Sequence, residues 1–158
     1  DCLMIATAAA IVSYIPIGFL SEKFGRKKCI QGGLVLLLLS YLGAAFFPVY
    51  HPAINIGFVL LGMGWASVSV NSLPMVVEIC SLGDVGKYTG VYYTFSMAAQ
   101  IFTPVFSGFF MQHISYRVLF PYVCIFTCMA MVTMSMVHHG DSRPQEKKSV
   151  LEHFDVED

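Results

Sequence analysis

Charged residues are scarce in this sequence, at 12% of 158 residues, whereas soluble domains carry roughly a quarter. The apolar stretches have no charge in their middle. This scarcity excludes an ordinary soluble domain, whose surface needs solvated charged side chains. The net charge of −1 is uninformative by itself, and we expect no nucleic-acid partner.

The spacing CxxC does not occur in this sequence. The five cysteines are Cys2, Cys29, Cys80, Cys124 and Cys128, all in or at the ends of apolar stretches. We therefore predict no disulfide framework and no metal site. An enzyme is the least expected class, because no nucleophile–base pair and no cluster of metal ligands falls at one depth of the apolar stretches.

Long apolar runs dominate instead, with 56% hydrophobic residues and a mean hydropathy of +0.69. A membrane core about 30 Å thick is crossed by a helix of ~20 apolar residues. Stretches of this length occur at 2–20, 29–47, 54–77, 90–111 and 119–137. The sequence predicts an all-α, polytopic transmembrane helix bundle over residues 1–138, followed by a polar tail over 139–158.

Basic residues predict the orientation of this bundle in the cell membrane. Of nine Lys and Arg, all but Arg117 lie in the connectors 21–28 and 78–89 or in the tail. Because basic residues are retained on the cytoplasmic side, those connectors and the tail are expected there. The chain begins with Asp1 at the start of a helix, so we expect it to lack the beginning of a longer protein.

The predicted helices differ in polarity. The helices 29–47 and 119–137 are nearly apolar all round, which favours peripheral positions. The other three carry polar residues, glycines and prolines, which favours internal positions. Short connectors make neighbouring helices antiparallel.

Two polar stripes run along single helix faces. Gly64, Ser67, Asn71, Met75 and Glu78 share one face of the third helix. That stripe is either a packing seam or the wall of a solute pathway; both interpretations stay open.

The fourth helix has a similar stripe of Tyr92, Ser96, Gln100, Thr103 and Ser107. Side chains that form several hydrogen bonds beside an aromatic ring suit a neutral polyhydroxylated solute, although helix packing is the alternative. Tyr14 on the first helix could line the same cavity or pack inside the bundle.

Glu78 lies at the end of its helix, opposite the basic connector. It could pair with Arg26, Lys27 or Lys87. A structural ion pair is expected rather than a proton relay, because the position is shallow.

The stretch Gly18–Lys28, GFLSEKFGRKK, resembles the signature loop of the major facilitator superfamily, with Glu22 where an aspartate is usual. The resemblance implies a partial major-facilitator fold comprising helices eight to twelve of an alternating-access transporter. The first half of the transporter is then the missing partner. It also implies a gate of Glu22, Arg26, Glu78 and Lys87, and a carrier that uses no prosthetic cofactor.

The stretches GMGWASVSVNSLPMVVEIC and GKYTGVYYTFSMAAQIFTP are similar to the sucrose and glycoside–cation symporters. This resemblance implies cation-coupled symport of a sugar or glycoside, with a proton or another cation as its partner. The expected solute contacts are Tyr14, Trp65, Asn71, Tyr92, Ser96 and Gln100. A drug or metabolite exporter of the same superfamily, and an inactive fragment or membrane scaffold, remain as alternatives.

Overall fold

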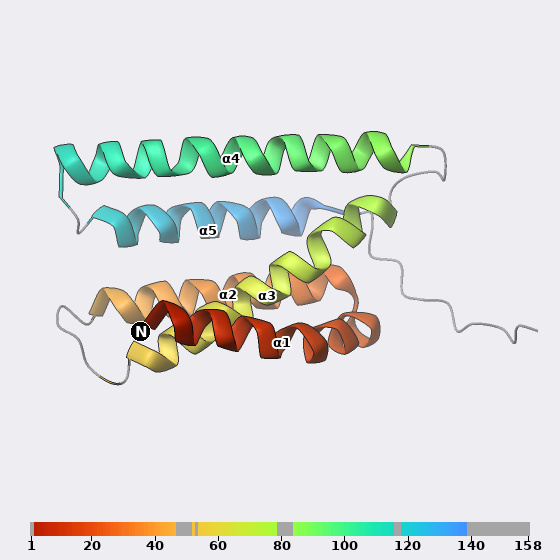
Figure 1. The fold of residues 1–158 in the computed structure, drawn as a ribbon, viewed down its shortest axis with the longest axis horizontal. Helices are drawn as coiled ribbons and strands as arrows, with labels where there is room; N and C mark the ends of the chain where they lie inside the picture. The colour runs from red at the N-terminus through yellow and green to blue at the C-terminus, as the bar shows by residue number, and fades with distance from the viewer. Residues whose placement is uncertain (1, 47–51, 53, 79–83, 116–117, 139–158) are drawn as a thin grey trace, which may run out of the picture.

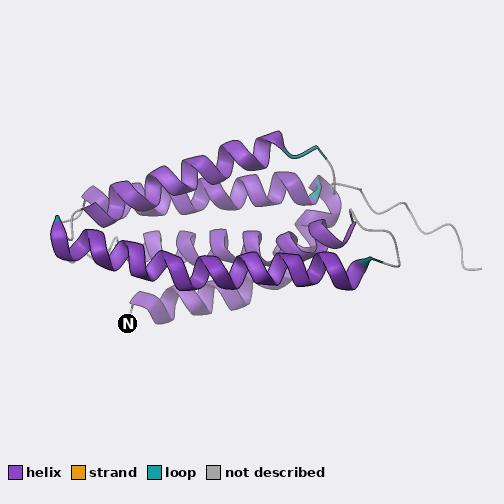
Figure 2. Cartoon of the chain, turned by 90° about the horizontal axis from the view of Figure 1, so that it is seen from above, coloured by secondary structure: helices purple, strands orange, loops and turns teal. Residues whose placement is uncertain are grey.

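The computed structural model describes residues 2–46, 52, 54–78, 84–115 and 118–138. These residues form five helices, with the bounds α1 Cys2–Phe24, α2 Arg26–Phe46, α3 Ile54–Glu78, α4 Val85–His113 and α5 Leu119–Met136. The helices α1, α2, α4 and α5 run along the long axis of the bundle, and α3 crosses it obliquely (Figure 1, Figure 2). The expected tail 139–158, Cys80 and Arg117 lie outside the described residues.

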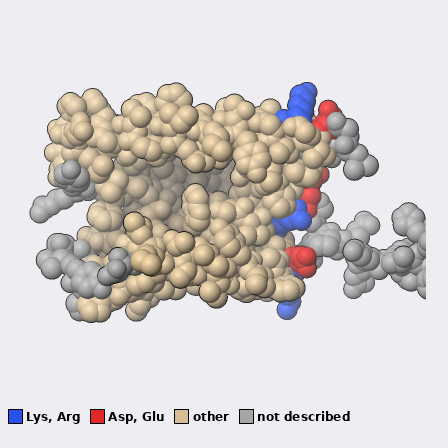
Figure 3. All heavy atoms as spheres, in the orientation of Figure 1, with Lys and Arg blue, Asp and Glu red and all other residues tan. Residues whose placement is uncertain are grey.

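All five helices are long and apolar enough to cross a membrane. The described Lys, Arg, Asp and Glu residues gather at one end of the bundle, which we call the charged end (Figure 3). This arrangement confirms the predicted all-α bundle of membrane-spanning helices.

The connector expected at 21–28 is almost entirely helical. Between α1 and α2 only Gly25 leaves the helix, with φ at 94°, a left-handed conformation that glycine adopts without strain. Its amide donates to the carbonyl of Ser21 at 3.0 Å. The helices extend past the predicted bounds because Glu, Lys and Arg are good helix formers, whereas a count of apolar residues stops where the membrane core ends.

The helix α3 is the centre of the packing. It lies against α1 and α2 along much of its length, while its last turns reach α4 (Figure 1). Interhelical hydrogen bonds reinforce the contact with α2: the Ser67 hydroxyl donates to the Cys29 carbonyl at 2.7 Å. The Ser40 hydroxyl donates to the Gly57 carbonyl, also at 2.7 Å.

The prediction that α2 is peripheral is wrong for these helices. Its Ile30, Leu34 and Leu37 form the buried core cluster together with Met75 of α3. In contrast, α4 was expected inside, yet none of its described residues is buried. An apolar helix is not excluded from the centre of a membrane bundle, since van der Waals packing drives helix association there.

Candidate functional site

The charged end is held together by side chains from the junction of α1 and α2. Arg26, the first residue of α2, forms an ion pair with Glu78, the last residue of α3. Both side chains are only partly exposed, at 28% and 21%. The sequence left three candidate partners for Glu78, and the tertiary structure pairs it with Arg26.

Lys27 binds a different helix end. Its ammonium donates to the carbonyl of Ser135 at 3.0 Å and also to the carbonyl of Val137. These carbonyls lie at the end of α5. The last carbonyl groups of a helix have no amide donor within the helix, and the helix dipole is negative there. The sequence did not identify this contact, because four cations lie close together and nothing in their spacing says which one reaches α5.

The other two expected members of the gate stay apart from the Arg26–Glu78 pair. Glu22 and Lys87 are both exposed. Within the described helices neither forms a hydrogen bond or an ion pair. In the described residues, the expected network of four is thus one ion pair and two separate exposed charges.

The stripe on α3 lies in the interface with α2. Asn71 is only 1% exposed, and its amide donates to the Ser67 carbonyl of its own helix at 2.8 Å. A Cβ atom on Gly64 would meet the Gly33 carbonyl oxygen at 2.7 Å. Protein surrounds Asn71 in this conformation, so its contact with a solute stays a prediction.

The stripe on α4 is placed differently, because this helix has no buried residue. Tyr92 and Ser96 line a cleft between α3 and α4, opposite Val76. The Gln100 amide points along the same face, at 3.4 Å from the Ser96 hydroxyl. We call Tyr92, Ser96 and Gln100 the α4 polar face.

Tyr88 also lines this cleft. It lies four residues before Tyr92, so extending the spacing of the stripe by one helical turn would have found it. Tyr14 and Trp65 are not among the residues that line the cleft. Their side chains are 38% and 59% exposed on α1 and α3.

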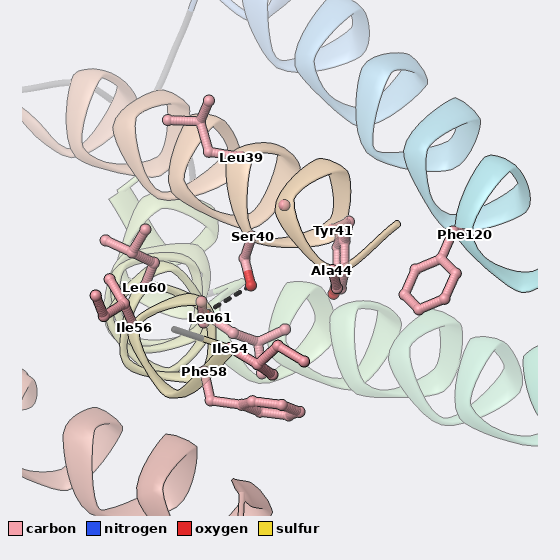
Figure 4. Close-up of a pocket in the computed structure, with 12 residues that line it drawn as sticks. Leu39, Ser40, Tyr41, Ala44, Ile54, Ile56, Phe58, Leu60, Leu61 and Phe120 are labelled. Carbon is pink, nitrogen blue, oxygen red and sulfur yellow. Dashed lines mark hydrogen bonds between the residues drawn. The ribbon is translucent and has the colours of Figure 1, made fainter. Parts of the chain in front are cut away.

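A second cavity, of about 330 Å³, lies between α2, α3 and Phe120 of α5 (Figure 4). Its walls are apolar except for Ser40 and Tyr41, and the Ser40 hydroxyl already donates to Gly57. A polyhydroxylated solute would lose its hydrogen bonds to water there without replacement. This cavity is therefore a poor candidate for such a solute.

Helices of membrane-spanning length, with the described Lys, Arg, Asp and Glu residues at one end, define a multi-pass helical membrane protein. The chain belongs to the Major Facilitator Superfamily, whose family model matches residues 2–154. The members of this family are transporters of small solutes.

A curated relative agrees with this assignment. The chain is 25% identical over 164 residues to a protein described as an uncharacterized MFS-type transporter of Schizosaccharomyces pombe. The alignment covers 99% of the chain and 36% of the relative, so the chain spans about a third of the length of the curated relative it matches. No solved structure matches the chain significantly.

Proposed function

We propose that this chain forms part of the second half of an alternating-access transporter that moves a sugar or glycoside together with a proton or another cation. In this proposal the five helices correspond to helices eight to twelve. A preceding first half, absent from the sequence given, completes the solute pathway. The share of the S. pombe transporter that the chain covers, 36%, is compatible with such a partner.

The α4 polar face carries the proposal. On this membrane-spanning helix with no buried residue, Tyr92 and Ser96 line the open cleft beside α3, and Gln100 is exposed on the same face. Polar side chains at membrane depth face water or other protein rather than lipid. A solute pathway shared with a first half supplies that environment, and hydroxyl and amide groups beside a tyrosine ring suit sugar hydroxyls.

The charged end supplies the second element of the proposed mechanism. The Arg26–Glu78 pair joins α2 to α3, while Lys27 joins α2 to α5. An ion pair that is present in one conformation and broken in another biases the equilibrium between the two. The charged end would then face the cytoplasm and stabilise the state closed on that side.

Transport by proteoliposomes tests the proposal. The complete transporter that contains this chain is reconstituted, and uptake of a labelled disaccharide is measured with and without a proton gradient. We expect gradient-driven uptake, which Gln100→Leu reduces at least about tenfold through the loss of a hydrogen bond to the solute. Thr94→Val is the matched control, since Thr94 lies on another side of α4 and its hydroxyl donates to the Gly90 carbonyl at 2.8 Å.

Three results would overturn the proposal in different ways. Drug efflux without disaccharide uptake would identify an exporter. Absence of any flux from the complete transporter would identify a scaffold. Equal uptake by the Gln100 and Thr94 variants would show that the α4 polar face is not part of the solute pathway.

A further inference from the structure

A groove at the charged end lies between α1 and α2, with α3 as its floor. Its volume is about 460 Å³. The α1 wall consists of Ile17, Leu20 and Phe24, which recur on one face of the helix. Leu36 of α2 and Met63 of α3 complete the apolar lining.

Gly32 leaves space in this groove on the side of α2. A Cβ atom added to Gly32 would meet no atom within 4 Å, so the space beside it is empty. One polar group in the lining, the Ser67 hydroxyl, already donates to the Cys29 carbonyl. The groove therefore offers van der Waals contact to an apolar occupant and no hydrogen bond to a polar one.

Positive charge stands at the mouth of the groove. Lys28 is part of the lining and is exposed. Unlike Arg26 and Lys27, it has no hydrogen-bond or ion-pair partner within the described residues. A second cation is close: the Lys23 ammonium lies 5.7 Å from the ring centroid of Phe24, which itself lines the groove.

Glu22, the acidic residue in this part of α1, lies on the side of the helix opposite the groove. Glu22 lies two residues after Leu20 and two before Phe24. At 100° per residue this spacing turns its side chain away from the groove face. The mouth of the groove is therefore positive, although the charged end as a whole contains both signs.

We propose that this groove binds an anionic phospholipid from the membrane leaflet at the charged end, with one acyl chain along the groove and the phosphate at Lys28 and Lys23. From Lys28 to Leu36 the groove follows α2 for about 12 Å. One leaflet of hydrocarbon is roughly 15 Å deep, so an acyl chain that enters beside Lys28 matches this length.

The apolar walls and the positive mouth of the groove together favour this occupant. An apolar channel within membrane-spanning helices is filled by what the bilayer supplies, and ammonium groups at the leaflet surface favour anionic head groups. A free phosphate ion would use the lysines but not the apolar walls. A neutral lipid would use the walls but not the lysines.

Native mass spectrometry of the complete, delipidated transporter tests the proposal. Phosphatidylglycerol and phosphatidylcholine with matched acyl chains are added separately. We expect the wild-type protein to bind one equivalent of phosphatidylglycerol about thirtyfold more tightly than phosphatidylcholine, the preference that two lysines near a membrane surface provide. Lys28→Gln should lower this preference about fivefold and leave phosphatidylcholine binding unchanged.

Filling the groove tests the acyl-chain site separately. Gly32→Leu should weaken the binding of both lipids at least tenfold. Gly43→Leu is the matched control, because Gly43 is on the same helix and a Cβ atom there also meets nothing within 4 Å. If Gly32→Leu does not elute as a folded protein on size exclusion, Gly32→Ala makes the same test with a smaller side chain.

The outcomes distinguish a bound phospholipid from a phosphate group that binds alone. Unchanged lipid binding in the Gly32 variants, or an unchanged head-group preference in Lys28→Gln, overturns the proposal. Displacement of the lipid by millimolar glycerol phosphate would show that a head-group phosphate alone occupies the mouth, and would also overturn it. Lipid binding is measured without transport, so failure of the proposed sugar transport leaves this result unaffected.

Discussion

The contact between α1 and α3 depends on a missing side chain at Gly62. A Cβ atom at this position would lie 2.1 Å from the Ala6 carbonyl oxygen and 3.0 Å from the Ala10 amide nitrogen. Both are backbone atoms, which cannot rotate away as a long side chain could. Gly62→Ala must therefore push α1 and α3 apart.

The size of this effect follows from the distances. Carbon and carbonyl oxygen approach to about 3.3 Å at the closest, so the helices would separate by about 1 Å. Ala6, Ala10 and the completely buried Ala66 would lose packing contacts. Overpacking of this kind costs about 1–3 kcal/mol, partly offset by the roughly 1 kcal/mol that alanine gains over glycine in a helix. We expect a net loss in unfolding free energy of up to about 2 kcal/mol, which is about 1–3 kcal/mol less stable than a Gly→Ala variant at an open helix position.

Unfolding in mixed detergent micelles, followed by circular dichroism, measures this loss in the complete transporter. Gly43→Ala is the control, because its Cβ atom would enter open space. The control should be unchanged or up to about 1 kcal/mol more stable. If Gly62→Ala proves as stable as Gly43→Ala, the close approach of α1 and α3 described above is wrong.

Three further experiments test the charged end. Lys27→Met removes the donor to the last carbonyls of α5, so we expect the same unfolding assay to show a loss of about 1–2 kcal/mol; equal stability of the exposed control Lys87→Met would contradict the capping role. Arg26→Glu and Glu78→Arg should each destabilise the protein, whereas the double variant should recover part of the loss; no recovery would mean that the pair contributes nothing. Glu22→Gln should slow uptake by proteoliposomes at unchanged membrane insertion, and unchanged kinetics would limit the segment to a role in topology.

Much of the fold could be predicted because the bilayer imposes simple requirements on a sequence. Each membrane helix needs about 20 apolar residues and satisfies its own backbone hydrogen bonds. Charge-free runs therefore identified every helix, and the charged segment between the first two marked one end of the bundle. The helix ends were less predictable, because polar helix formers such as Glu22 and Lys27 continue a helix beyond the apolar core.

The polar stripes show where reasoning from sequence stops. The stripes on α3 and α4 have the same spacing and similar residues, and each could be a seam or a pathway wall. In the structure Asn71 is buried against α2, whereas Ser96 and Gln100 lie on a helix with no buried residue. Helical periodicity places residues on a face, but only the packing of other helices decides what that face meets.

The sequence by itself determined the class of this protein: the number of membrane helices in the described part of the chain, the end at which their charges gather and the superfamily that the signature segment resembles. These properties depend on composition and local spacing, because a bilayer admits apolar helices that satisfy their own backbone hydrogen bonds. Only the tertiary structure decided that Arg26 meets Glu78, that Lys27 reaches the end of α5 and that Lys28 stands at the mouth of a groove. The three residues are consecutive, and their different partners follow from the distinct directions in which successive residues of a helix point.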